Sequence, residues 1–176
     1  MIALVLGGVR SGKSEVAESL AARRGGPVTY VATGGEHPDD PDWAARVAAH
    51  RARRPRAWST VEVPAGAELG PVLAGLSGTA LVDSLGTWLA GREGAEDHNE
   101  RLCTAVVARA GDTVLVSEEV GLGVHPVTRV GRRFRDDLGA LNRAVAEVAE
   151  EVLLVVAGRV LPLSRWDGGG RGGPAA

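Results

Sequence analysis

Apolar residues along this chain occur either in short continuous runs or at every third or fourth position. Continuous runs are typical of strands that are buried on both faces, and they predict strands at residues 2–6, 28–33, 79–83, 113–117 and 152–157. The wider spacing is typical of amphipathic helices, and it predicts helices at about residues 12–24, 41–54, 100–109 and 129–150. Because strands and helices alternate, we expect an α/β fold: a doubly wound, mostly parallel sheet with helices on both faces.

The segments between these elements predict the remaining organisation. We expect an extended segment at residues 58–63 and a short helix within residues 64–78. A turn is expected at residues 84–89 and a polar loop at residues 93–99. Residues 167–176 are rich in glycine and carry no large aliphatic side chain, which predicts a disordered tail. The chain is therefore expected to form one domain, residues 1–166, followed by this tail.

The first apolar run leads into a glycine-rich segment, in which Gly7, Gly12, Lys13 and Ser14 have the spacing G-x-x-x-x-G-K-[ST]. A strand before this segment and a helix after it are the context of a P-loop, which binds nucleotide phosphates. Gly7, Gly8 and Gly12 can adopt positive φ angles, which bring backbone N–H groups close to phosphate oxygens. The positive end of the following helix points at the same anion. Lys13, the only lysine in the chain, is expected to contact the β- and γ-phosphates, and Ser14 to bind Mg²⁺.

Composition and charge favour a small-molecule ligand over a macromolecule. The 176 residues include 20 basic and 22 acidic side chains, so no overall positive charge attracts nucleic acid or an acidic membrane. No apolar run approaches the roughly 20 residues of a membrane span, and no secretion signal is recognisable. The single cysteine, Cys103, excludes an internal disulfide and fits a reducing compartment. We therefore expect a cytoplasmic protein without a membrane span.

Polar side chains stand at the ends of three predicted strands. They are Thr33, Asp83 and Glu118. The carboxyl ends of parallel strands meet at one edge of a sheet, so we expect these side chains to lie beside the P-loop. Carboxylate oxygens are ligands that Mg²⁺ prefers, and Asp83 is the first choice to assist Ser14, with Glu118 as the alternative.

A histidine lies among arginines on the predicted helix 41–54. His50 is four residues from both Arg46 and Arg54, so the three share a helix face. A neutral imidazole is an available nitrogen nucleophile near pH 7, because its usual pKa is about 6.5. Neighbouring arginines are expected to keep it neutral and to stabilise charge on an attacked phosphate. Taken alone, His50 is more simply interpreted as a surface histidine.

With these segments assembled, residues 1–160 resemble one family, the bifunctional adenosylcobinamide kinase / adenosylcobinamide-phosphate guanylyltransferases of cobalamin biosynthesis. Several separate motifs carry the resemblance in the same order: residues 7–14, Tyr30-Val31-Ala32-Thr33, Ala45-Arg46-Val47 to His50-Arg51, Arg54-Pro55 with Trp58, Glu119-Val120-Gly121-Leu122-Gly123, and Arg133-Phe134-Arg135-Asp136 with Gly139 and Asn142. The chain departs from the family in having Glu118 where asparagine is common, and Ala49 before His50 where a second histidine is common.

The resemblance implies a P-loop NTPase-like fold and two reactions: phosphorylation of adenosylcobinamide by ATP or GTP, and transfer of GMP from GTP to that phosphate. It implies that His50 carries GMP as a phosphoramidate. From the residues themselves, Lys13 is expected to be catalytic, and Ser14 and Asp83 are expected to bind Mg²⁺. The resemblance further implies a homo-oligomer, specifically a trimer. The implied nucleotide contacts are Gly7, Gly8, Val9, Arg10, Ser11, Gly12, Lys13, Ser14, Ala32, Thr33, Gly34, Arg51, Ala52, Arg53, Arg54, Glu62 and Asp83.

Two other functions remain open from the residues themselves. The first is a P-loop kinase for another small alcohol, in which His50 is incidental and no covalent nucleotide forms. The second is a regulatory protein that uses the P-loop as a nucleotide switch. The sequence does not distinguish ATP from GTP as the first phosphate donor, and no motif marks the corrinoid site.

Overall fold

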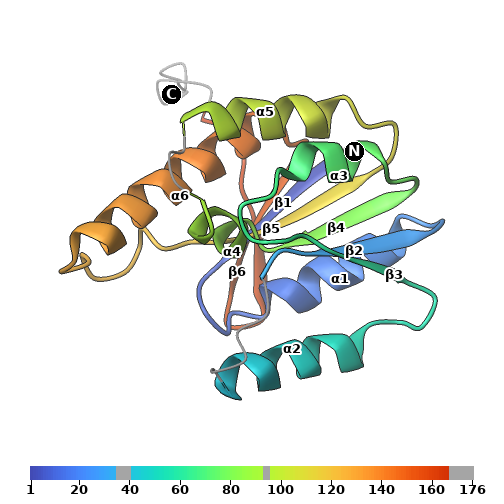
Figure 1. Ribbon diagram of the computed structural model, residues 1–176, viewed down its shortest axis with the longest axis horizontal. Helices are drawn as coiled ribbons and strands as arrows, with labels where there is room; N and C mark the ends of the chain where they lie inside the picture. The colour runs from blue at the N-terminus through green and yellow to red at the C-terminus, as the bar shows by residue number, and fades with distance from the viewer. Residues whose placement is uncertain (35–40, 93–95, 167–176) are drawn as a thin grey trace, which may run out of the picture.

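A seven-stranded sheet with helices on both faces forms the body of the molecule in the computed structural model, which describes residues 1–34, 41–92 and 96–166 (Figure 1). The strands are β1 (Ile2–Gly7), β2 (Val28–Ala32), β3 (Ser59–Glu62), β4 (Thr79–Asp83), β5 (Thr113–Glu118), β6 (Glu151–Val156) and β7 (Arg159–Pro162). The helices are α1 (Lys13–Arg23), α2 (Pro41–Arg53), α3 (Leu69–Ala74), α4 (Leu85–Ala90), α5 (Glu96–Val107) and α6 (Arg129–Val148). The predicted α/β class is confirmed.

The strand order is β3-β2-β4-β5-β1-β6-β7, and every neighbouring pair is parallel except β6 and β7. β1 therefore lies between β5 and β6, with β4 one strand further away. In the register of the sheet, Gly7 pairs with Glu118 and Ala32 pairs with Asp83. This register brings the P-loop and the two predicted strand-end acids to one edge of the sheet.

Two hydrophobic cores explain why the central strands are continuous apolar runs. One core joins alternate residues of β1, β4 and β5 to α3, α4, α5 and α6, and includes Leu4, Leu115 and Leu138. The other packs the opposite face of the sheet against α1, and includes Val5 and Ala17. Because both faces are covered, these strands have no polar alternation. Figure 1 shows α1 and α2 on one side of the sheet, and α3 and α5 on the other.

Three elements differ from the prediction. α4 is a helix where a turn was expected, because Ser84 and Thr87 form a capping box around its first turn. α5 begins at Glu96, within the segment expected to be a polar loop. β7 was not predicted, since all four of its residues are exposed and it pairs only with β6. The predicted tail and residues 93–95 lie outside the described residues.

The beginning of α6 does not pack as its periodicity predicts. Val130 was expected in the core stripe of this helix, but it is 79% exposed, whereas Leu138, Leu141 and Val145 are fully buried. Figure 1 shows the first turns of α6 projecting beyond the sheet. Its last turns supply the core contacts. Within the ranges the structure describes, no helix has the length and apolar character needed to cross a bilayer.

Candidate functional site

The segment between β1 and α1 has the backbone of an anion-binding loop. α1 begins at Lys13, and Gly12 before it has a φ of +92°, a left-handed angle that glycine tolerates best. Arg10 also has a positive φ, +57°. Positive φ angles were expected at Gly7 and Gly8 as well, and this expectation is wrong. The helix start nevertheless confirms that the P-loop leads into a helix N-terminus, where phosphates bind.

Gly7 is required for space rather than for its backbone angle. A Cβ at this position would lie 2.8 Å from the Val155 carbonyl oxygen, and closer still to Ser11 Oγ. A Cβ at Gly8 would meet nothing within 4 Å. The loop is therefore closely packed against β6 at its first glycine and open at its second.

Lys13 lies beside an acid at the end of the neighbouring strand. Its Nζ is 3.6 Å from Glu118 Oε1 and 3.4 Å from the Gly8 carbonyl oxygen. The other carboxylate oxygen of Glu118 accepts a hydrogen bond from the Ser84 hydroxyl at 3.1 Å. Gly86 leaves the room for this carboxylate, because a Cβ there would collide with Glu118 Oε2. Glu118 therefore offsets the charge of the lysine that the motif assigns to the β- and γ-phosphates.

Asp83, at the end of β4, is the more enclosed of the two strand-end acids. Its side chain is 10% exposed, against 24% for Glu118. Burial alone would raise the pKa of this carboxyl, but hydrogen bonds with His50, Tyr30 and Ser14 and the nearby imidazole lower it below its usual value. An ionised carboxylate next to the Ser14 hydroxyl is an oxygen donor set suited to Mg²⁺. Among the residues placed by the structure, no three His, Cys, Asp or Glu side chains are grouped as a metal site.

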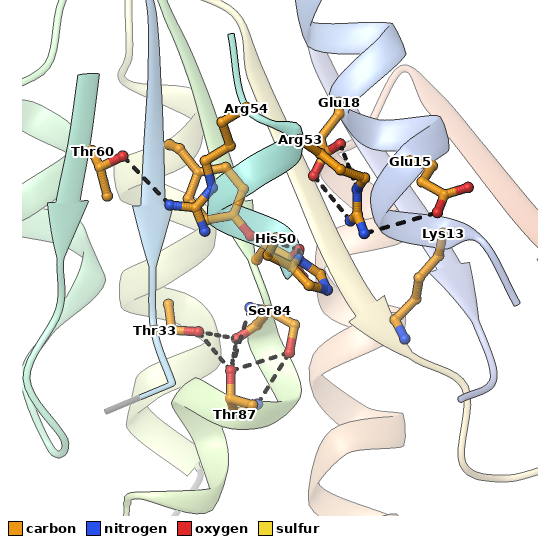
Figure 2. Close-up of polar contacts among 12 residues, drawn as sticks. Lys13, Glu15, Glu18, Thr33, His50, Arg53, Arg54, Thr60, Ser84 and Thr87 are labelled. Atoms are coloured by element: carbon orange, nitrogen blue, oxygen red, sulfur yellow. Dashed lines mark hydrogen bonds and ion pairs between the residues drawn. The ribbon is translucent and has the colours of Figure 1, made fainter. Parts of the chain in front are cut away.

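His50 lies in the last turns of α2 and faces the end of β4. Its Nδ1 is 3.5 Å from Asp83 Oδ2, and its side chain is 28% exposed. Arg53 connects α2 to α1, with guanidinium nitrogens 3.3 Å from Glu18 Oε1 and 3.9 Å from Glu15 Oε1. Figure 2 shows His50 in the middle of this group, with Arg54 on one side and Lys13 on the other. The structure therefore brings the predicted nucleophile close to the P-loop.

The arginines near His50 have partners of their own. The Arg54 guanidinium carbon lies 3.4 Å from the centroid of the Tyr30 ring, a cation–π contact. Arg51 donates a hydrogen bond of 2.6 Å to Glu62, and both side chains are more than half exposed. The side chain of Arg46 is outside the described part of the chain. The carboxylate of Asp83, rather than a guanidinium, lies beside the Nδ1 atom of His50.

A group of hydroxyls closes the site between β2 and α4. Thr33 Oγ1 donates a hydrogen bond to the Ser84 carbonyl oxygen at 2.6 Å and lies 2.7 Å from Thr87 Oγ1 (Figure 2). These contacts hold the segment formed by Ala32, Thr33 and Gly34 against the end of β4. Two further predicted nucleotide contacts, Val9 and Ala52, are exposed to solvent.

The sequence did not identify Tyr30, Ser84 or Thr87 as parts of the site. Tyr30 lies in a short apolar strand, where an aromatic residue is usually interpreted as core, and it is 2% exposed. Its hydroxyl donates a hydrogen bond of 2.8 Å to Asp83 Oδ2. Two signals were available: Tyr30 begins one of the motifs that carry the family resemblance, and this single tyrosine of the chain brings a polar group into an otherwise apolar strand.

The other histidines were interpreted as solvent-exposed loop residues. His125 is exposed, and its Nδ1 lies 2.6 Å from an Arg135 nitrogen. His98 differs from the expectation: its ring is half-buried, its Nδ1 lies 3.0 Å from Arg92 Nη2, and it packs edge-on against Trp88. His37 lies outside the described residues.

Comparison with known proteins gives a consistent result. The model of the family described as cobinamide kinase / cobinamide phosphate guanyltransferase matches residues 3–163. The bifunctional adenosylcobalamin biosynthesis protein CobP of Pseudomonas aeruginosa is 40% identical, over 91% of this chain and 95% of the relative. The bifunctional adenosylcobalamin biosynthesis protein CobU is 36% identical in Salmonella typhimurium and 34% in Escherichia coli, in each case over 90% of this chain and 97% of the relative. The match covers every strand of the sheet and all the site residues described above, and the chain therefore belongs to the cobinamide kinase / cobinamide phosphate guanyltransferase family.

Proposed function

We propose that the protein is a bifunctional enzyme. It phosphorylates adenosylcobinamide with ATP or GTP, and then transfers GMP from GTP to that phosphate to give adenosylcobinamide-GDP. Besides family membership, one observation carries the proposal: His50 Nδ1 lies 3.5 Å from Asp83 at the end of β4, and Lys13 Nζ lies 3.6 Å from Glu118 at the end of the neighbouring strand β5. An imidazole nucleophile and a γ-phosphate-binding lysine therefore lie at one edge of one sheet.

In the kinase step the aminopropanol hydroxyl of adenosylcobinamide attacks the γ-phosphorus of the nucleotide. The bond from this phosphorus to the β,γ-bridging oxygen breaks, the hydroxyl proton passes to water, and a nucleoside diphosphate leaves. Lys13 and the N–H groups at the start of α1 stabilise the charge on the transferred group. Glu118 must give up part of its contact with Lys13 when phosphate arrives, because both compete for the same ammonium.

Ser14 and Asp83 are proposed to hold Mg²⁺, which supplies charge neutralisation for the nucleotide phosphates. The observation that fits this role is a carboxylate at the end of β4 that is only 10% exposed and whose pKa is lowered by its neighbours His50, Tyr30 and Ser14. Two protein oxygens leave the remaining positions to phosphate oxygens and water, as is usual for Mg²⁺. Both activities are expected to disappear with EDTA and to return when Mg²⁺ is added in excess.

In the guanylyl step His50 attacks the α-phosphorus of GTP, and pyrophosphate leaves with the electrons of the broken P–O bond. A phosphate oxygen of adenosylcobinamide phosphate then attacks the same phosphorus, and the P–N electrons return to the imidazole. The guanidinium groups of Arg51 and Arg54 lie on the same stretch of chain as His50 and are proposed to stabilise the α-phosphate charge.

The test is to incubate the purified protein with adenosylcobinamide, GTP and Mg²⁺ and to follow products by mass spectrometry. The wild type should form the phosphate first and the GDP derivative second. His50→Asn should stop at the phosphate, because the P-loop does not need the imidazole. His125→Asn, which changes an exposed histidine, is the matched control and should form both products. A His50→Asn variant that makes the GDP derivative at the wild-type rate would remove His50 from the mechanism.

A further inference from the structure

Three side chains from three different elements meet at one carboxylate. Asp83 Oδ2, at the end of β4, accepts a hydrogen bond from the Tyr30 hydroxyl of β2 at 2.8 Å. The same oxygen lies 3.5 Å from His50 Nδ1 on α2. Asp83 is 10% exposed and Tyr30 is 2% exposed, so water has little access to this contact.

This contact distinguishes the two nitrogens of the His50 ring. An ionised carboxylate only accepts hydrogen bonds, so a neutral imidazole facing it carries its hydrogen on the facing nitrogen, here Nδ1. The lone pair available for attack then belongs to Nε2. We propose that Asp83 and Tyr30 position His50 with its hydrogen on Nδ1, so that GMP becomes bonded to Nε2; this inference rests on the guanylyl transfer proposed above.

Tyr30 is a positioning residue in this arrangement, since it acts on His50 through Asp83. Its hydroxyl holds Oδ2 in place, and its ring is held in turn by the Arg54 guanidinium 3.4 Å from its centroid. A phenol is protonated near neutral pH and an ionised carboxylate can only accept, so the tyrosine hydroxyl is the donor in this hydrogen bond. Without this hydrogen bond, Oδ2 would lose the contact that fixes its position beside the imidazole.

The guanylyl transfer balances in electrons and protons when GMP is bonded to Nε2 and the hydrogen stays on Nδ1. The Nε2 lone pair forms the bond to the α-phosphorus, and the bond from phosphorus to the α,β-bridging oxygen breaks as pyrophosphate departs. The ring becomes positively charged while Nδ1 keeps its hydrogen, and Asp83 lies where this charge develops. When the acceptor phosphate attacks, the P–N electrons return to Nε2, and the original tautomer is restored.

The ring nitrogen of His50 to which GMP is bonded can be determined directly. Wild-type protein labelled with GTP would be oxidised with periodate and subjected to β-elimination, which leaves phosphohistidine. Its two isomers are separated by chromatography and identified by ³¹P NMR. The Nε2-linked isomer alone is expected. The Nδ1-linked isomer would overturn the proposal.

The positioning roles are tested in the protein without nucleotide. ¹⁵N NMR of wild-type protein at pH 8 should show the His50 tautomer with hydrogen on Nδ1, and the opposite tautomer would overturn the proposal. This measurement does not depend on guanylyl transfer. If the wild type has the expected tautomer but takes up no GMP, the proposed function fails and the positioning by Asp83 stands.

The variant Tyr30→Phe keeps the ring and its contact with Arg54 but removes the hydroxyl. It should take up GMP at least tenfold more slowly and lose the single tautomer. Thr29→Val, at the adjacent position of β2 on the opposite face, is the matched control and should change neither. Labelling of Tyr30→Phe at the wild-type rate with an unchanged tautomer would exclude the role of Tyr30. If Tyr30→Phe fails to fold, the linkage and tautomer of the wild type still decide the proposal.

Discussion

At the scale of single residues, the P-loop depends on two glycines for two different reasons. Gly12 supplies a left-handed backbone angle before α1, whereas Gly7 supplies space next to Val155. The sequence motif indicates both positions but not the reason for either. Gly8 is under neither constraint, because its φ is not positive and a Cβ at this position would meet nothing within 4 Å. The motif does not show this either.

A pair of alanine variants tests this difference. Gly7→Ala should destabilise the protein by about 1–3 kcal/mol, because its Cβ would force apart Ser11 and the β6 backbone. Gly8→Ala should change the free energy of unfolding by less than about 0.5 kcal/mol. Urea unfolding of both variants gives the comparison. Equal stability of the two variants would show that the loop relaxes around Gly7.

A methionine variant tests the role of Lys13. Lys13→Met keeps most of the aliphatic side chain but removes the charge that stabilises the transferred phosphate, so kinase turnover should fall by roughly 10²–10³-fold. Unfolding should change by no more than about 1 kcal/mol, because the ion pair with Glu118 is partly solvated. The two readouts are steady-state phosphorylation of adenosylcobinamide and thermal unfolding. Turnover near the wild-type value would show that the P-loop does not serve catalysis.

The sequence predicts the residues of the site better than it predicts their contacts. Lys13, Ser14 and His50 follow from motifs, because a motif names residue types at fixed spacing. The contact of His50 with Asp83 joins residues 33 positions apart on α2 and β4, and only the register of the sheet and the placement of α2 bring them together. The part played by Tyr30 was hidden for the same reason.

At the scale of elements, four of the five predicted strands are largely buried on both faces, where a continuous apolar run has few other interpretations; in β6 only Leu153 and Val155 are buried. α4 and β7 were missed because each is too short to show a clear period. α4 begins with the local capping box of Ser84 and Thr87, whereas β7 depends on pairing with β6, outside its own segment. Periodicity alone also placed Val130 in the core, since it does not reveal how far α6 extends past the sheet.

One side chain ties several elements together and gives a prediction at this scale. The Arg109 guanidinium donates to the carbonyl oxygens of Leu73, Leu76 and Gly78 and to Thr113 Oγ1, and so joins the end of α3 to the starts of β4 and β5. Arg109→Met should leave these carbonyls unpaired and cost about 2–4 kcal/mol of stability. Arg143→Met, at an exposed position of α6, is the control and should stay within about 0.5 kcal/mol of wild type. Equal denaturation midpoints for the two variants would contradict this account.

At the scale of the whole molecule, the loop before α6 and the first turn of that helix carry an apolar surface. Leu122, Val124, Val127 and Val130 are between 79% and 94% exposed. Exposed apolar residues gathered in this way are unusual on a monomer. Together with the family resemblance, they lead us to predict that the protein associates with itself.

The expected assembly is a trimer. Light scattering of the eluted protein should give three times the mass of one chain, and Val127→Asp should shift the mass towards that of one chain, because a charge is costly to bury in an interface. Val160→Asp, on the exposed strand β7, is the comparison variant and tests whether the effect belongs to the apolar surface around the start of α6. A single-chain mass at every concentration would contradict the trimer.

The central claim is that one protein uses His50 to carry GMP as well as a P-loop to transfer phosphate. The most direct measurement is to incubate the protein with Mg²⁺ and GTP labelled either at the α- or at the γ-phosphate, and to count the label that survives denaturation. The α-label should remain bound, be released by acid but not by alkali as expected for a phosphoramidate, map to the peptide containing His50, and be absent from His50→Asn. The γ-label should not remain. Protein that binds GTP by calorimetry but retains no α-label would contradict the claim and leave a kinase without guanylyl transfer.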